Sequence, residues 1–388
     1  MSYPTRTRDQ HLANDGKPKR ILALDGGGLR GILSLGLLQT LENILRERSQ
    51  AGDDFRLSHY FDLIAGTSTG AIIAATLALG WKVEEIRGRY MMLGERVFTR
   101  SLLRQGVLRA KYDDATLISE LKKVYGAKTT LGGPELQTGL LVMTKRLDTG
   151  SPWPISNNPK GAYFAARPNA VVGDADYPLW QVVRASTAAP AYFDSQQITI
   201  ARAAAGAKAV TGEFVDGGVS PFNNPALMAM MYATMIGYRI NWPTGEDKLL
   251  VVSIGTGAAD PTVTHASLAA KQAVDALLSL MNDAATLQEM LLQWLSDGAT
   301  ARRINREVGD LEGDVLNGVA ALTYRRYNVD LRASCVRELE PALQDPKLIE
   351  SLSAMDSPAN MTILHRLGAL AAQRDIKAEH FPAAFDLE

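Results

Sequence analysis

Residues 64–70 read IAGTSTG, and the chemistry expected of the chain starts from this stretch. Residues 59–65 form an apolar run that predicts a buried strand, and the small and apolar residues after Ser68 predict a helix. The spacing Gly66-x-Ser68-x-Gly70 is typical of a nucleophile elbow, a strained strand-to-helix turn that exposes a serine hydroxyl. Glycines suit the two flanking positions because a Cβ there would collide with neighbouring backbone. Ser68 is therefore the candidate nucleophile.

A second glycine turn comes earlier in the chain. Residues 20–25 predict a short strand that runs into DGGGLRG at 25–31, and a helical pattern continues to about Arg48. Consecutive glycines let backbone N–H groups point into one cavity at a helix N-terminus, which is the arrangement an oxyanion hole needs. The candidate donors are Gly26, Gly27 and Gly28. Arg30 either reinforces the positive potential there or pins the loop.

The same turn also fits the G-x-G-x-x-G fingerprint of dinucleotide-binding proteins, through Gly26, Gly28 and Gly31. That fingerprint calls for an acidic residue at the end of the next strand. Here the next predicted strand runs into the serine elbow instead. A dinucleotide-dependent oxidoreductase is therefore the disfavoured alternative.

A serine nucleophile usually works with a base, and the sequence offers two candidates. His265 follows the glycine turn at 255–257 and would complete a triad in the order Ser, Asp, His, as in α/β-hydrolases. Asp216 ends a predicted strand, and the sharp turn at Gly217 and Gly218 could aim its carboxylate at the rim that carries Ser68. We favour Asp216, and the triad with His265 stays as the alternative.

Predicted strands alternate with predicted helices, which indicates an α/β layered sheet with its chemistry at the strand ends. Asp113 is a candidate helix N-cap, and residues 201–211 are expected to form a loop or an edge hairpin. Residues 1–19 are expected to be a flexible arm. From about residue 265 onward the pattern is mainly helical.

The composition narrows the class of protein. A net charge of −1 over 388 residues argues against a dominant DNA- or RNA-binding surface. Cys335 is the one cysteine, so a reducing compartment is expected. The polar N-terminus has no signal-peptide core, and no apolar run is long enough to span a bilayer. We expect a cytoplasmic protein that contacts the inner membrane peripherally during catalysis, and no Cys, His or Asp cluster has metal-ligand spacing.

Taken together, these motifs resemble the patatin-like phospholipase family. The matching segments are DGGGLRG at 25–31, GTSTG at 66–70, RASTAAPAYF at 184–193, Asp-Gly-Gly at 216–218 and SIGTG at 253–257. The resemblance implies a three-layer α/β/α domain over about 20–330, related to cytosolic phospholipase A2, with a helical extension over 331–388. It also implies a Ser68–Asp216 dyad without histidine that hydrolyses acyl esters of glycerophospholipids and needs no metal or cofactor.

The sequence is compatible with more than one mode of regulation and with more than one role for several surface segments. In length and layout the chain resembles bacterial members that a cyclic nucleotide activates in anti-phage defence, and a constitutive lipid or lysophospholipid hydrolase, a host-directed toxin and a catalytically silent binding protein are its rivals. YRRY at 324–327 is either a nucleotide site or a strand with alternating faces. The basic stretch 96–111 is a membrane contact, a lid or a packed helix. Residues 277–295 are helical core, a lipid-facing cap or the interface of a homo-oligomer.

Overall fold

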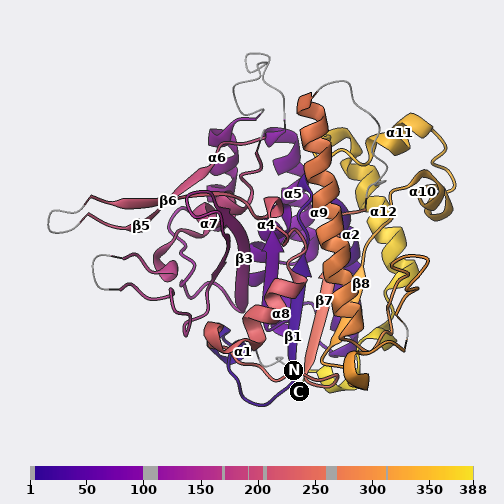
Figure 1. Cartoon of the computed structure of the whole chain (residues 1–388), viewed down its shortest axis with the longest axis horizontal. Coiled ribbons are helices and arrows are strands. Elements are labelled where there is room, and N and C mark those ends of the chain that lie inside the picture. Colours follow the sequence, from indigo (N-terminus) through magenta and orange to yellow (C-terminus); the bar gives the residue numbers. More distant parts are fainter. Residues whose placement is uncertain are drawn as a thin grey trace.

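The computed structural model describes residues 5–98, 112–167, 171–190, 192–203, 208–258, 269–311 and 313–387. Within these ranges, a mixed eight-stranded sheet lies between two layers of helices (Figure 1). The strand order is β5-β6-β3-β2-β1-β7-β8, and β4 pairs with β3. The strands are β1 (Lys19–Leu24), β2 (Leu63–Thr67), β3 (Gly139–Arg146), β4 (Pro152–Ser156), β5 (Gln196–Ala201), β6 (Val210–Asp216), β7 (Leu249–Ile254) and β8 (Thr323–Tyr327). The predicted three-layer α/β/α class is confirmed.

Alternate residues of each central strand face the two helical layers. In β1, Leu22 and Leu24 join one apolar core, while Ile21 and Ala23 join the other. The strands β1, β2, β7, β8 and the first part of β3 are mutually parallel. Parallel strands buried on both faces need apolar residues at every position, which is why they appear in the sequence as continuous apolar runs.

The two layers differ in size. One layer contains α2 (Gly31–Arg48), α4 (Thr69–Ala78), α5 (Val83–Val97), α6 (Asp114–Tyr125), α7 (Leu179–Ser186) and α12 (Met361–Asp375). The other contains α8 (Ala226–Thr234) and α9 (Ala269–Trp294), which cross the front of the molecule in Figure 1. Shorter helices are α1 (Arg8–His11), α3 (Leu57–Tyr60), α10 (Ala333–Leu339) and α11 (Pro346–Ser351). The 3₁₀ turns include η1 (Gly28–Arg30), η3 (Asp174–Asp176), η4 (Gly217–Val219), η5 (Ile236–Tyr238), η6 (Leu316–Gly318), η7 (Pro358–Asn360), η8 (Ala378–His380) and η9 (Ala383–Phe385).

The start of the chain is packed where the structure describes it, and the expectation of a flexible arm is wrong for residues 5–19. Thr7 caps α1 through a capping box with Gln10. His11 is buried, and its Nδ1 lies 2.9 Å from Asp62 Oδ1 at the start of β2. This contact joins residues 51 positions apart, so no local sequence pattern predicts it.

Local signals placed most other elements correctly. Asp113 caps α6 by accepting a 2.9 Å hydrogen bond from the Thr116 N–H, as predicted. β5 and β6 pair antiparallel at the edge of the sheet, as the edge-hairpin interpretation of residues 201–211 expects, and positions 204–207 of that segment lie outside the described residues. The strand predicted from His59 begins only at Leu63, because the His59 ring accepts a hydrogen bond from the Arg56 N–H and closes the short helix α3.

The C-terminal helix α12 packs closely on α2. A Cβ at Gly36 would lie 2.6 Å from the His365 carbonyl oxygen, and one at Gly368 would lie 2.2 Å from that of Leu33. Glycines at these two positions let the helix backbones approach, so the chain end is part of the helical layer. No helix in the described part of the chain has the length and apolarity required to cross a bilayer.

Candidate active site

Ser68 lies at a strained turn between β2 and α4. Its φ of 54° is in the left-handed region, which non-glycine residues rarely occupy. A Cβ at Gly66 would lie 2.3 Å from the Gly70 carbonyl oxygen, and one at Gly70 would lie 2.1 Å from that of Leu24. Both glycines are therefore needed for the turn to close against β1. The geometry is that of a nucleophile elbow, with a ten-residue helix directed at the serine.

Ser186 holds the elbow from α7. Its hydroxyl accepts a 2.8 Å hydrogen bond from the Ser68 N–H and donates one of 2.6 Å to the Met143 carbonyl on β3. Because a hydroxyl both donates and accepts, one small side chain links α7, β3 and the elbow. The sequence offered no signal for this role beyond the position of Ser186 inside the segment RASTAAPAYF.

The sheet register places Asp216 beside Ser68. On β3, Met143 pairs with Thr67 of β2, and the next residue, Thr144, pairs with Asp216 of β6. β2 leaves the sheet at the elbow, and β6 enters from the opposite direction to take over the same edge of β3. Residues 148 positions apart in the chain thus become neighbours.

The Asp216 carboxyl group is buried and hydrogen-bonded. The Ser68 side chain lies close enough to act on the pKa of this group, and Asp216 Oδ1 accepts a 2.7 Å hydrogen bond from the Gly218 N–H. Burial raises its pKa to about 6, although Ser68, the Gly218 N–H and the charge of Arg184 act in the opposite direction. A Cβ at Gly217 would lie 2.5 Å from the Met143 carbonyl oxygen, so this glycine lets the turn lie against β3. A carboxylate with this pKa can act as a base near neutral pH.

The glycine loop after β1 lies against Ser68. A Cβ at Gly26 would lie 3.2 Å from that of Ser68. The Gly26 N–H already donates to the Asn223 carbonyl at 3.0 Å, whereas no described residue accepts from the N–H groups of Gly27 and Gly28. Of the three predicted oxyanion donors, Gly27 and Gly28 therefore have N–H groups free for a ligand.

Two residues far away in the sequence fix the shape of this loop. Thr256, in the SIGTG segment, donates a 2.9 Å hydrogen bond to the Gly26 carbonyl, and its Oγ1 would lie 2.2 Å from a Cβ at Gly27. Met355 accepts a 2.7 Å bond from the Leu29 N–H, and its carbonyl oxygen would lie 2.3 Å from a Cβ at Gly28. Gly28 also has a φ of 58°. The loop is held open by contacts that only glycine allows.

Arg30 follows the loop and is buried. Its side chain is 6% exposed, and its Nε and Nη1 find no hydrogen-bond partner among the described residues. Burial lowers its pKa to about 10, so the guanidinium still carries its charge at neutral pH. Arg30 therefore places a positive charge with unsatisfied donors next to the glycine loop.

The arginines of YRRY support the sheet. Arg326 forms two hydrogen bonds with the buried carboxylate of Asp25, at 3.0 and 2.6 Å, and a third with Ser253. Arg325 forms two with Asp297, at 2.6 and 2.7 Å. Both side chains are buried in ion pairs and the segment is strand β8. These contacts favour the interpretation of YRRY as a strand over its interpretation as a nucleotide site.

Other predicted features lie partly outside the described residues. His265 and positions 99–111 of the basic stretch are outside them. Two described histidines have partners away from Ser68, since His11 contacts Asp62 and His380 contacts Tyr327. In the segment 277–295, Leu292 is buried while Leu280, Leu287 and Trp294 are exposed, so this helix is core on one face only.

Comparisons with known proteins bear on the same region. A family profile described as patatin-like phospholipase matches residues 22–230, more than half of the chain. The chain is similar to a cGAMP-activated phospholipase of Escherichia coli (26% identity, 66% of this chain, 67% of the relative). A cGAMP-activated phospholipase of Vibrio cholerae is similar too (27% identity, 69% and 72%). An intracellular phospholipase A2 of Caenorhabditis elegans shares 28% identity over 75% of this chain, which spans only 24% of that relative.

Proposed function

This chain belongs to the patatin-like phospholipase family, and we propose that it hydrolyses acyl esters of glycerophospholipids with Ser68 as the nucleophile and Asp216 as the base. The observation that carries the proposal is the placement of a serine at a strained elbow beside a buried carboxyl group with a pKa of about 6. A serine hydroxyl is a weak nucleophile until an adjacent base removes its proton.

The reaction follows from these positions. Asp216 accepts the Ser68 proton as Oγ attacks the ester carbonyl carbon, and the carbonyl oxygen becomes an oxyanion. The N–H groups of Gly27 and Gly28 donate to that oxygen. Collapse of the intermediate breaks the bond to the leaving alcohol, which takes the proton from Asp216 and departs as a lysolipid. A water molecule, deprotonated by Asp216, then attacks the acyl-enzyme, and the fatty acid is released as Ser68 Oγ takes the proton back from Asp216. All of these groups belong to the chain itself, so the mechanism calls for no metal ion.

Arg30 acts through its charge in this proposal. Its guanidinium raises the positive potential around the glycine loop, where negative charge develops in the transition state. The resulting electrostatic field adds to that of the helix N-terminus behind Ser68.

Fatty-acid release from phospholipid vesicles tests the dyad. We expect Ser68→Ala and Asp216→Ala to lose essentially all activity while keeping wild-type secondary structure. The matched controls are Ser353→Ala and Asp176→Asn, at exposed positions in other parts of the chain, and they should behave like the wild type. Full activity in Asp216→Ala would rule out the dyad and favour the alternative in which His265 is the base.

Two relatives are described as cGAMP-activated phospholipases, and on this ground we propose that a cyclic nucleotide switches the hydrolysis on at the cytoplasmic face of the membrane, in defence against phage. The assay above, repeated with and without cGAMP, decides between a gated and a constitutive enzyme. Activity that depends on Ser68 but is unchanged by the nucleotide would support the proposed hydrolysis and contradict the proposed nucleotide activation.

A further inference from the structure

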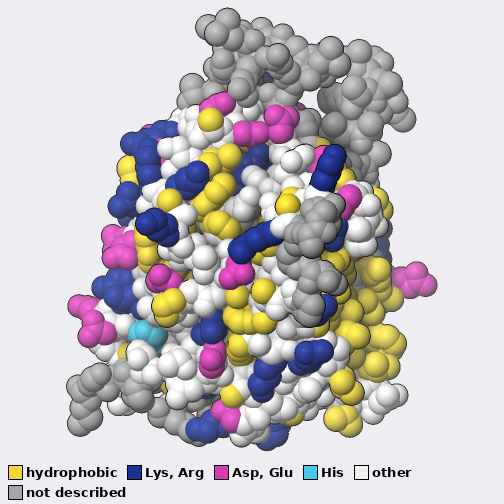
Figure 2. Space-filling model, turned by 90° about the vertical axis from the view of Figure 1, so that its left-hand side faces the viewer, with side chains coloured by type: hydrophobic (Ala, Val, Ile, Leu, Met, Phe, Trp, Pro, Cys, Tyr) yellow, Lys and Arg dark blue, Asp and Glu magenta, His cyan; other side chains and the backbone are white. Residues whose placement is uncertain are grey.

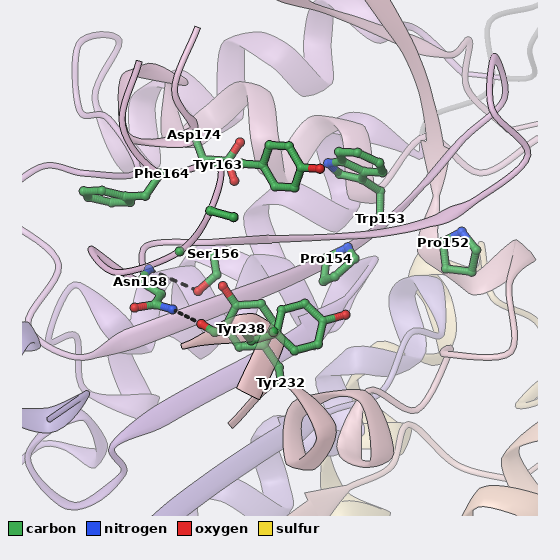
Figure 3. A pocket seen from close by; sticks show the side chains of 13 residues that line it. Pro152, Trp153, Pro154, Ser156, Asn158, Tyr163, Phe164, Asp174, Tyr232 and Tyr238 are labelled. Carbon is green, nitrogen blue, oxygen red and sulfur yellow. Dashed lines mark hydrogen bonds between the residues drawn. The ribbon is translucent and has the colours of Figure 1, made fainter. Parts of the chain in front are cut away.

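A pocket of about 240 Å³ lies beside β4, away from Ser68 (Figure 3). β2 and β4 pair with the same residues of β3, 141–143, so they lie on opposite edges of that strand. The pocket is therefore separated from the elbow by β3. Its volume is below the roughly 300–1,000 Å³ of sites for drug-sized ligands, which suits a single ring system.

Two aromatic pairs line the pocket, one on each side of β4. Trp153 and Tyr163 have ring centroids 5.8 Å apart, and Tyr232 and Tyr238 have centroids 4.3 Å apart. In Figure 3 the first pair lies above β4 and the second pair below it. Tyr163 is 54% exposed although it is a large aromatic side chain. Aromatic faces of this kind bind flat rings by stacking, a contact worth roughly 1–3 kcal/mol per base in nucleic-acid complexes.

One acidic side chain lines the pocket. Asp174 lies next to Tyr163 in Figure 3, and its N–H donates a 2.8 Å bond to the Tyr163 carbonyl. Burial raises the pKa of its carboxyl group to about 7, and the charge of Arg167 only partly offsets this effect. No hydrogen bond to this carboxyl group comes from the described residues. The two carboxyl oxygens of Asp174 can therefore accept hydrogen bonds from a ligand in the pocket.

Positively charged side chains lie near the rim of the pocket, in contrast to the acidic Asp174 that lines it. The Arg167 guanidinium lies 4.6 Å from the Tyr163 ring centroid, and Lys160 directly precedes Gly161, which lines the pocket. Both Arg167 and Lys160 are exposed. An organic cation would suit Asp174 and the aromatic rings but would meet this positive rim. A ligand with a flat, donor-bearing ring and an attached anion matches both parts.

We propose that this pocket binds the guanine base of a cyclic dinucleotide, with the phosphates at Arg167 and Lys160. The inference rests on the proposed nucleotide activation and gives it a site. The N1–H and N2–H groups of guanine form a donor pair that a carboxylate can accept, whereas the corresponding edge of adenine has an acceptor at N1. Asp174 therefore selects guanine, and the exposed Tyr163 ring beside Asp174 supplies an aromatic surface for the base.

The pocket is linked to the active site by a short route. The Trp153 carbonyl of β4 accepts a 2.7 Å hydrogen bond from the Thr144 hydroxyl, and Thr144 is the residue of β3 that pairs with Asp216. A ligand that moves Trp153 therefore acts on the residue beside the catalytic base. This route gives the bound nucleotide a way to bias the position of Asp216.

Binding and hydrolysis are measured separately in the test. Calorimetry of the full-length Ser68→Ala protein with cGAMP and with c-di-AMP reports binding without turnover, and vesicle hydrolysis by proteins with intact Ser68 reports activation. We expect binding of cGAMP and at least tenfold weaker binding of c-di-AMP. Asp174→Asn and Tyr163→Ala should each weaken cGAMP binding at least tenfold and raise the nucleotide concentration needed for activation by a similar factor.

The matched control is Asp176→Asn, an exposed acid on the same 3₁₀ turn that does not line the pocket. It should bind and respond like the wild type. Wild-type cGAMP binding by both Asp174→Asn and Tyr163→Ala would overturn the proposal, as would equal affinity for the two dinucleotides. Hydrolysis that depends on Ser68 without any nucleotide binding would contradict the nucleotide site and still support the dyad. Nucleotide binding without hydrolysis would support the nucleotide site and contradict the dyad.

Discussion

Asp216 follows directly on Thr67 along one edge of β3, because Thr67 pairs with Met143 and Asp216 pairs with Thr144. One strand leaves this edge at the elbow and another arrives from the opposite direction. The sheet register therefore sets the relative position of the two residues of the proposed dyad. Displacing either strand by one residue would move its side chains to the other face of the sheet.

The pH dependence of hydrolysis should report the Asp216 base. Asp216 must be ionised to accept the Ser68 proton, and burial holds its pKa at about 6. We expect kcat/KM to fall as the pH drops through about 6 and to be level from pH 7 to 8. Arg184 is the charged group that acts on the pKa of Asp216, and it lowers that pKa. A soluble ester substrate avoids the titration of lipid headgroups, and a profile that is flat from pH 5 to 8 would contradict this assignment.

Asp216→Asn should stabilise the fold while it abolishes activity. The folded-state pKa of Asp216 is raised, so the ionised form opposes folding. This penalty is absent below about pH 4, grows between pH 4 and 6, and is complete above pH 6. The variant should gain up to about 3 kcal/mol in free energy of unfolding at pH 8. Urea denaturation at pH 4 and pH 8 measures the difference, and a variant less stable than the wild type at pH 8 would refute the argument.

Gly27→Ala should disable the glycine loop. Its Cβ would lie 2.2 Å from Thr256 Oγ1, so the loop must shift and carry its free N–H groups with it. Loss of an oxyanion donor typically lowers kcat about 10²- to 10³-fold, and we expect a loss of this size with little change in thermal stability. Gly52→Ala, an exposed glycine with open space around it, serves as control. Wild-type kcat in Gly27→Ala would exclude the loop from catalysis.

Arg326→Met should destabilise the protein through its partner. The substitution leaves the Asp25 carboxylate buried and unpaired at the end of β1. Breaking one side of a buried ion pair typically reduces the free energy of unfolding by about 3–5 kcal/mol. The double variant with Asp25→Asn should recover part of that loss, and Arg303→Met, at an exposed position, should have little effect. Unchanged stability together with lost nucleotide binding would instead indicate a ligand role for Arg326.

Local sequence patterns determined the individual parts of the site. The elbow at Ser68 and the glycine turn at 26–28 each lie where an apolar run meets a helix start, and that junction is visible over a few residues. Asp216 was also predictable, since it ends a strand at a Gly-Gly turn. These patterns are readable because backbone strain, helix capping and strand burial act over short stretches of chain.

Only the tertiary structure decided which distant groups complete these parts. Ser186 and Thr256 hold the elbow and the glycine loop, yet a serine or threonine in a loop has no pattern that points to a partner more than 100 residues away. The same holds for His11, which the sequence assigned to a flexible arm and the fold buries against Asp62. Such contacts form because buried polar groups must find partners, and the three-dimensional packing alone determines which partners are within reach.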